Sequence, residues 1–295
     1  MHPAFSVLLF TVTAGVGFGL LFCLLVSQHL FGAPSTLPDY LTQIGFAVMI
    51  YSIGLMSSTF HLANPKNAWR SFARFKTSWL SKEGVLAVMS YPILMLYVAA
   101  LLKEWNELGV ALAIILLLLL IALTVCTAMI YRSLKTIPQW HNAWVIPSFL
   151  ILSFASGLVL YGALNEPSLA IKGLVCVSLL ACGGVKLGYF RQVGAPDKSS
   201  IQSATGFSQA SVTLFDSGHS SRNFSEREFM YEVGPKTKTL ARRLVIGIGF
   251  GVSGVLMMLD APWGAFICLY LGLLLERWLF FVEAKHVIRH FYDQA

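Results

Sequence analysis

The sequence has few charged residues, and this deficit limits what the chain can be. Charged side chains make up 12% of the 295 residues, hydrophobic ones make up 56%, and the mean hydropathy is +0.70. A soluble domain of this composition could not keep its apolar surface away from water. The sequence therefore predicts an all-α, polytopic membrane protein, in contact with membrane lipid and with no nucleic-acid partner.

Cysteine is also scarce. Cys23, Cys126, Cys176, Cys182 and Cys268 all fall inside predicted helices, and none belongs to a CxxC pair. This placement argues against a disulfide framework or a metal cluster, and small apolar packing residues are the simpler interpretation. Any iron-sulfur or molybdenum centre is therefore expected in a partner, and no metal ligand is assigned to this chain.

Apolar runs of about 20 residues, the length that crosses a bilayer, predict a bundle of eight transmembrane helices. The spans are expected at 4–31, 40–62, 83–102, 109–131, 144–164, 168–190, 244–260 and 264–283. The first is too long for a cleaved signal peptide and is expected to stay as a helix. The segment 191–243 is too polar and too short for a catalytic domain. We therefore treat 1–295 as a single integral membrane domain with a cytoplasmic loop at 191–243.

The distribution of Lys and Arg orients the chain. With eight spans and both termini inside, the inner segments hold 17 of the 21 basic residues, whereas the outer loops between spans hold only Lys103. Basic residues in short flanking segments keep those segments in the cytoplasm. We therefore expect both termini on the cytoplasmic side of the membrane.

A histidine and a glutamate stand at the two ends of the basic loop between the second and third spans: His61 lies at the end of the second span and Glu83 opens the third. Desolvation beside hydrocarbon disfavours an ionised carboxyl group, so Glu83 can exchange a proton near neutral pH, as an imidazole does unaided. The pair is typical of proton-coupled redox chemistry at a bilayer surface. A structural interpretation stays open, in which Glu83 caps the third helix and His61 rests at the interface.

Further candidates lie at the same predicted membrane face. The fourth span ends in Tyr131 and Arg132, and Trp79 comes shortly before Glu83 in the sequence. A phenol and a guanidinium beside a proton-exchanging pair are able to hydrogen-bond a quinone carbonyl, although an interfacial aromatic belt explains the tryptophan equally well. The sequence predicts a site for ubiquinone or menaquinone, an exchanged substrate, formed by His61, Glu83, Trp79, Tyr131 and Arg132.

Charges inside the spans have two interpretations. Lys172 and Lys186 lie near opposite ends of one span, so both side chains could reach an interface. Glu276 lies at a depth near that of Lys186, counting 1.5 Å per residue. An ion pair between Lys186 and Glu276 and a place on a proton pathway are the alternatives for this carboxylate.

Two glycine patterns and the histidines complete the candidates. Gly249–Gly254 matches GxGxxG, but it lies in an apolar span without a βαβ unit, so the match is interpreted as accidental. Gly15 with Gly19, and Gly247 with Gly251, are instead predicted to pack helices closely. Two histidines at mid-membrane depth on separate spans, as a haem b would need, are missing. A haem b near the inner surface, held by His61 or His141, stays an alternative.

Several tracts resemble one known family. His61–Arg70, followed by Ser78–Glu83, is similar to the DmsC family, the eight-helix membrane anchors of dimethyl sulfoxide reductase type molybdoenzymes. The opening His2–Val7, the tract Thr127–Pro138 and the region around Phe229–Arg243 extend the similarity. Within it, Thr136–Trp140 is similar to the anchors of cytoplasmic sulfite dehydrogenases.

This resemblance implies an anchor that holds a four-cluster iron-sulfur subunit and a molybdopterin catalytic subunit and exchanges electrons between quinone and the clusters. It implies the bacterial inner membrane, no haem, and functional roles for His61 and Glu83. Here the basic side that carries His61 is predicted to be cytoplasmic, which favours cytoplasmic partners. The alternatives are a terminal reductase anchor, a haem b membrane cytochrome and a small-solute transporter, although no internal repeat suggests the last.

Reporter fusions test the predicted orientation. We expect fusions after Asn106 and after Glu166 to report a periplasmic position, and a fusion near Ser220 to report the cytoplasm, because the basic residues lie on that side. The opposite pattern would reverse the orientation and move the expected partner subunits to the other side of the membrane.

Overall fold

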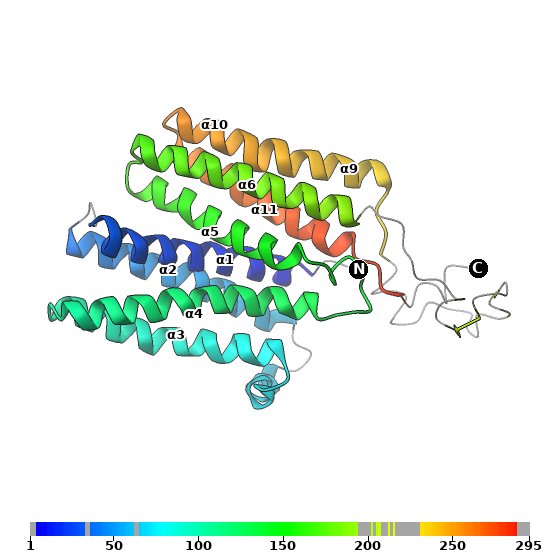
Figure 1. Cartoon of the computed structure of the whole chain (residues 1–295), viewed down its shortest axis with the longest axis horizontal. Helices are drawn as coiled ribbons and strands as arrows, with labels where there is room; N and C mark the ends of the chain where they lie inside the picture. Colours follow the sequence, from blue (N-terminus) through cyan, green and yellow to red (C-terminus); the bar gives the residue numbers. More distant parts are fainter. Residues whose placement is uncertain are drawn as a thin grey trace.

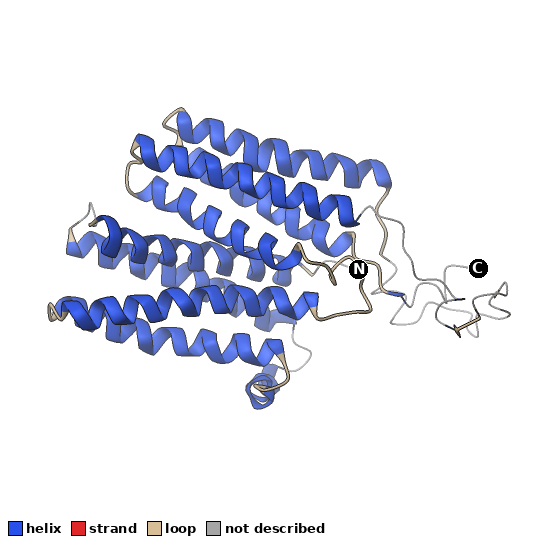
Figure 2. Cartoon of the chain, in the orientation of Figure 1, coloured by secondary structure: helices blue, strands red, loops and turns tan. Residues whose placement is uncertain are grey.

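The computed structural model describes residues 4–32, 36–61, 65–193, 202, 205–207, 212, 215 and 231–287. Every regular element in these ranges is a helix (Figure 2). Eight helices are long and apolar enough to cross a membrane, as expected where no water is present to pair with the backbone. The predicted all-α architecture with eight spans is therefore confirmed.

The helices follow one another up and down a single bundle (Figure 1). In chain order the elements are α1 (Phe5–Val26), η1 (Ser27–Phe31), α2 (Leu37–Ser57), η2 (Ser58–His61), η3 (Pro65–Arg74), α3 (Trp79–Leu102), α4 (Asn106–Arg132), α5 (Val145–Leu164), α6 (Leu169–Val193), α9 (Pro235–Leu244), η4 (Val245–Val252), α10 (Ser253–Met258) and α11 (Pro262–Val282). The segments α9, η4 and α10 together form one span.

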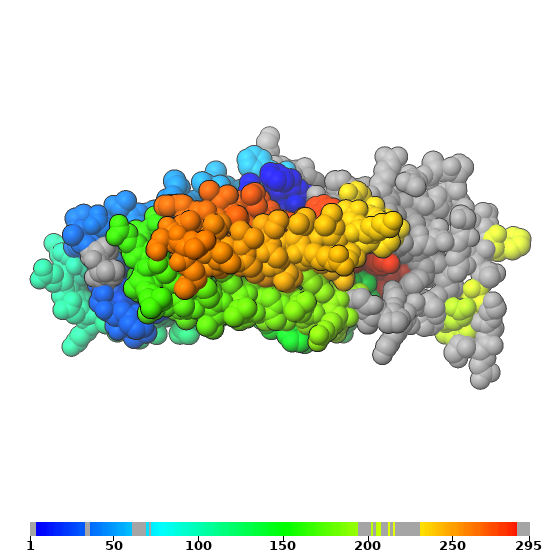
Figure 3. Space-filling view, turned by 90° about the horizontal axis from the view of Figure 1, so that it is seen from above, coloured from blue at the N-terminus to red at the C-terminus, as the bar shows by residue number. Residues whose placement is uncertain are grey.

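The bundle has two halves that meet along α1 and α5. One half contains α1 to α4, and the other contains α5, α6, α11 and the α9–α10 span (Figure 1). In the second half, α9 and α10 run alongside α6 across the face shown in Figure 3. The spans formed by α1, α5 and α11 are the most buried of the eight, so they make up the centre of the bundle.

The starts of two spans differ most from the prediction. The seventh span begins at Pro235 and not at 244, because residues 235–243 continue as helix α9 with Pro235 in its first turn, where the missing N–H costs nothing. The third span begins at Trp79 and not at Glu83. In both cases the first turns of the helix contain Lys or Arg, so they were not counted in the apolar run that defined the span.

Small residues allow the closest helix contacts. A Cβ placed on Gly19 would meet the Ser153 carbonyl group, and one placed on Gly157 would meet the backbone of Gly19 and Leu20. The predicted packing of Gly15 and Gly19 is confirmed, and α5 is the partner. Backbones that approach this closely gain van der Waals contact that larger side chains would prevent.

The second glycine prediction is wrong in its residues. Gly247 has nothing within 4 Å of an added Cβ, and Gly251 meets only a carbonyl of its own span. Gly249 makes the close contact, against Gly272 of α11. The span is π-helical in η4, and its turns are wider than those of an α-helix. Residues four apart therefore no longer lie on one face there, so Gly249 and not Gly247 or Gly251 meets α11.

The two ends of the bundle differ in their connections. At one end each described turn contains a left-handed residue: Gly32 between η1 and α2, Glu104 between α3 and α4, Glu166 between α5 and α6, and Asp260 between α10 and α11. The other end carries η3, the 133–144 connection and the start of α9, with exposed Arg70, Arg74, Lys76, Lys135 and Lys236. We call it the basic end.

The contact between α1 and α5 predicts a specific sensitivity. Gly157→Ala should lower the free energy of unfolding by about 1–3 kcal/mol or more, because the added methyl group meets backbone that cannot move aside cheaply. Gly173→Ala in α6 is the matched control, since nothing lies within 4 Å of its added Cβ. Thermal unfolding of the purified protein in detergent measures both, and equal midpoints for the two variants would contradict the packing.

Candidate functional site

Glu83 is buried in the second turn of α3 and does not cap the helix. The cap is Ser78, whose hydroxyl accepts a hydrogen bond from the Ser81 N–H at 3.4 Å. The Glu83 side chain is only 4% exposed, and the Thr127 hydroxyl of α4 donates to its Oε1. The capping interpretation of Glu83 is therefore wrong, and the carboxyl group lies between α3 and α4 near the basic end.

Thr127 was missed as a site residue by the sequence analysis. Its hydroxyl lies within hydrogen-bonding distance of Glu83 and also of the Leu123 carbonyl, at 3.1 Å. A threonine in an apolar helix usually bonds its own backbone in this way, so nothing in the sequence alone indicates the second contact. The spacing in the sequence could have identified Thr127 as a candidate. It precedes Tyr131 by four residues, so the two side chains share one helix face.

His61 ends η2, the short helix that continues α2 at the basic end. Its side chain lies outside the described part of the structure, so a contact between His61 and Glu83 stays a prediction. An apolar groove of about 430 Å³ adjoins η2. Phe5 and Leu9 of α1, Ile53 and Met56 of α2, and Phe60 of η2 are among its lining residues.

The other predicted quinone ligands occupy three different surroundings. Trp79 is half-buried at the start of α3, and the Lys82 ammonium group lies 4.0 Å from the centre of its ring. Tyr131 is 8% exposed and packs edge-on to Trp140, with ring centres 5.2 Å apart. Arg132 is partly exposed, and its carbonyl accepts from His141 Nδ1 at 2.7 Å. A contact of any of them with quinone stays a prediction.

A second buried polar cluster lies across the bundle in the other half. Lys186 of α6 is 1% exposed, and its ammonium group lies 2.5 Å from Glu276 Oε1 of α11. The ion-pair interpretation is confirmed, and the expectation that Lys186 reaches the interface is wrong. Lys172, near the opposite end of α6, pairs instead with Asp260, whose side chain is 75% exposed.

Arg277 adds a third charge to this cluster and was not considered from the sequence. Its Nε lies 3.1 Å from Glu276 Oε2, and its guanidinium group stacks 3.7 Å from the ring centre of Phe149. The side chain is 4% exposed. Lys186, Glu276 and Arg277 together carry one surplus positive charge, and such a group is costly to bury unless other polar partners reach it.

His29 and the five cysteines make other contacts. His29 Nε2 lies 3.1 Å from the Tyr97 hydroxyl at the end opposite the basic end. All five cysteines lie within helices and are free thiols, as expected for packing residues. In the described ranges, no three His, Cys, Asp or Glu side chains come close enough together to hold a metal ion.

Comparison with known proteins identifies the family. A family model described as the DMSO reductase anchor subunit (DmsC) matches residues 1–206. The chain belongs to the DmsC family. It is 33% identical to the C subunit of the sulfite dehydrogenase of Allochromatium vinosum, over 100% of each chain. It is 26% identical to YnfH, a chain of the anaerobic dimethyl sulfoxide reductase of Escherichia coli, over 48% of this chain and 52% of that one. The resemblance stated from the sequence is therefore confirmed.

The family match covers the part of the chain that contains Glu83, Thr127 and Lys186, whereas Glu276 and Arg277 lie beyond it. The similarity to the sulfite dehydrogenase protein spans both parts. Among the described residues, the spans of this DmsC-family chain bury charged side chains at two places, Glu83 beside the basic loop and the Lys186, Glu276 and Arg277 cluster between α6 and α11.

The buried charges predict an asymmetric response to substitution. Glu276→Gln leaves two buried cations without their shared anion and should cost roughly 3–5 kcal/mol of stability. Lys172→Met is the control, because its partner is largely exposed and the pair contributes about 1 kcal/mol or less. Denaturant unfolding in detergent compares them, and equal midpoints would argue against a stabilising role for Glu276.

Proposed function

We propose that the chain is the membrane anchor and quinone-reactive subunit of an oxidoreductase complex with a molybdopterin catalytic subunit and a four-cluster iron-sulfur subunit. In this role it exchanges electrons between the quinone pool and the iron-sulfur partner. Membership of the DmsC family supports the anchor role. The full-length similarity to a sulfite dehydrogenase protein supports sulfite as the compound oxidised by the catalytic partner, with quinone as the electron acceptor.

The strongest support for a quinone site near the basic end comes from Glu83. Glu83 is a carboxyl group held inside the bundle, close to the surface where the chain is most basic, and among the described residues only the Thr127 hydroxyl bonds it. Reduction of a quinone consumes two protons with two electrons, so the site needs a group that can give up a proton and recover it. Glu83 meets this need, and His61 ends the neighbouring helix.

The apolar groove beside η2 supports the same location. Its lining is almost entirely apolar, between α1 and α2, and it ends at Phe60, next to His61 in the chain. A quinone combines a polar ring with an isoprenoid tail. The tail would lie in this groove or in the adjoining lipid, and the ring would lie toward His61 and Glu83. Trp79, Tyr131 and Arg132 would complete the surroundings of the ring.

The basic end is the proposed docking surface for the soluble subunits. Exposed Arg70 and Arg74 of η3, Lys135 and Lys236 all lie there, and a positively charged surface favours association with an acidic partner. Docking at this end also brings the iron-sulfur subunit nearest to Glu83. The predicted orientation places both partners and both termini in the cytoplasm, with the anchor in the bacterial inner membrane.

Two substitutions test the quinone assignment in the assembled complex. Glu83→Gln keeps the size of the side chain but removes the group that carries the proton, and His61→Ala removes the imidazole. We expect both variants to retain the soluble subunits on copurification and to lose quinone-linked turnover by roughly 10²- to 10⁴-fold. Electron transfer from sulfite to an artificial dye at the soluble subunits should persist.

Ser90→Ala is the matched control, because this buried hydroxyl lies about two turns beyond Glu83 on α3 and donates to the Ala87 carbonyl. Its quinone-linked turnover should equal that of the unmodified complex. Normal quinone turnover in both Glu83→Gln and His61→Ala would overturn the assignment. Loss of the soluble subunits during purification of the unmodified complex would argue against the anchor role.

A further inference from the structure

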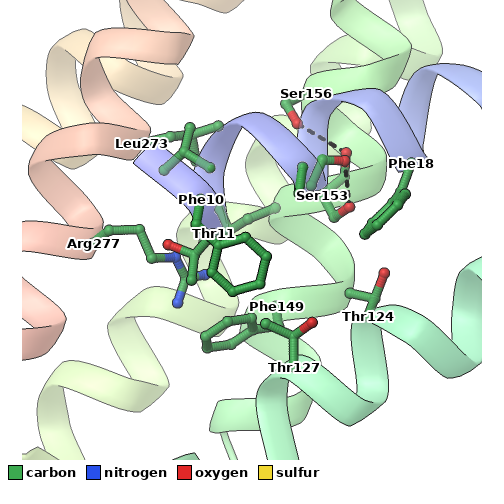
Figure 4. A pocket seen from close by; sticks show the side chains of 14 residues that line it. Phe10, Thr11, Phe18, Thr124, Thr127, Phe149, Ser153, Ser156, Leu273 and Arg277 are labelled. Carbon is green, nitrogen blue, oxygen red and sulfur yellow. Dashed lines mark hydrogen bonds between the residues drawn. The ribbon is translucent and has the colours of Figure 1, made fainter. Parts of the chain in front are cut away.

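A small cavity lies between α1, α4, α5 and α11 (Figure 4), and apolar side chains such as Phe10, Phe18 and Leu273 share its lining with polar ones. Its volume is about 30 Å³, which is room for about two water molecules at roughly 10–15 Å³ each. Five hydroxyl-bearing residues and one arginine are among the residues that line this space. They are Thr11, Thr124, Thr127, Ser153, Ser156 and Arg277.

The hydrogen bonds of these groups leave spare acceptors around one buried donor without an acceptor. Thr124 donates to the Leu120 carbonyl at 3.0 Å, and Ser153 donates to the Gly15 carbonyl at 2.6 Å. Each hydroxyl oxygen therefore keeps its lone pairs as acceptors. Arg277 Nη1 is buried, and no acceptor in the described structure meets it. Water, which both donates and accepts, satisfies such a set of acceptors around one charged donor.

Thr127 joins the cavity to Glu83. A hydroxyl group carries one hydrogen, yet Thr127 Oγ1 lies within bonding distance of both Glu83 Oε1 and the Leu123 carbonyl. When Glu83 is ionised, Thr127 donates to the carboxylate. When Glu83 is protonated, it donates to Thr127, which then donates to Leu123. The threonine can therefore pass a proton between the cavity and the carboxyl group without moving its backbone.

On the far side of the cavity, polar groups continue toward the basic end. Arg277 pairs with Glu276, and Glu283 follows Glu276 by seven residues, on the same face of the chain as it leaves α11. The buried Tyr189 hydroxyl has no hydrogen-bond partner among the described residues, and the Lys186 ammonium group lies 3.9 Å from the centre of its ring. Burial raises the pKa of Glu283, and its hydrogen bond with Arg242 only partly opposes this.

We propose that the cavity holds ordered water molecules bound to Arg277, and that this water, through Thr127, donates and accepts the protons of Glu83. The proposal rests on the proposed function, in which Glu83 supplies protons to quinone. Arg277 acts as a positioning residue, because it fixes the water and does not touch quinone. The route continues past Glu276 and Tyr189 to Glu283 at the basic end.

The proton balance of the relay is simple. Each proton that Glu83 gives to a reduced quinone oxygen leaves a carboxylate, which takes the hydrogen of the Thr127 hydroxyl. The threonine oxygen takes a hydrogen from the cavity water, and the water is reprotonated from the basic end. One proton thus enters for each proton consumed, two per quinone, and no group of the relay is oxidised or reduced.

Three variants of the assembled complex test the relay. Thr127→Val removes the hydroxyl at nearly constant volume, Thr124→Leu fills the cavity, and Arg277→Met removes the group that binds the water while leaving the Lys186–Glu276 pair intact. Each should lower quinone-linked kcat about tenfold or more, toward the loss that removal of a proton-transferring group causes. The KM for quinone and the dye-linked activity should stay unchanged, and the solvent deuterium isotope effect should increase.

The Glu83→Gln variant and Ser90→Ala, as before, serve as controls in the same preparation, and their outcomes separate the two proposals. Loss of quinone turnover in Glu83→Gln, with unmodified kcat and isotope effect in all three relay variants, would overturn the relay and leave the proposed function standing. Full turnover in Glu83→Gln would overturn the proposed function itself. Electron cryo-microscopy of the complex gives an independent test. Water at Arg277 Nη1 is expected, and an empty cavity in a map that resolves other buried water would reject the relay.

Discussion

The close crossing of α1 and α5 is the contact on which the rest of the bundle depends. Gly19 and Gly157 lie backbone to backbone, and because no side chain separates them, the two halves of the bundle share one core. The crossing brings α4 and α11 close to the same stretch of α1 and α5, so that Thr127 and Arg277 line one cavity. Larger residues at the crossing would push the halves apart and separate the two buried polar groups.

The surrounding lipid explains how the buried charged side chains are arranged. A charge inside a span is costly unless a partner reaches it. The described bundle accommodates its buried charged groups in two different arrangements. Lys186 and Arg277 share Glu276, whereas Glu83 bonds the Thr127 hydroxyl. The first carboxyl group lies beside two cations. The second has no cation beside it among the described side chains, which suits a group that must gain and lose a proton.

The sequence was sufficient for features that the bilayer dictates directly. Its thickness sets the length of the spans, and the constant rise per residue placed Lys186 and Glu276 at similar depths. Equal depth made an ion pair one of two alternatives, and the structure decided between them. Features that depend on how each helix is rotated were missed. The adjacent Arg277 turns toward the cavity only because of the packing of α11, and the contact between Thr127 and Glu83 depends on where α3 meets α4. The π-helical turn in η4 shifted the packing glycine to Gly249.

The central claim is that quinone binds at the basic end, between the end of α2 and the start of α3. Photoaffinity labelling tests it most directly, with a photoreactive quinone analogue applied to membranes that contain the assembled complex. We expect labelled peptides within residues 53–83 and 127–132, with labelling suppressed by unmodified quinone. Suppressible labelling confined to the opposite end, around Glu104, Glu166 or Asp260, would contradict it.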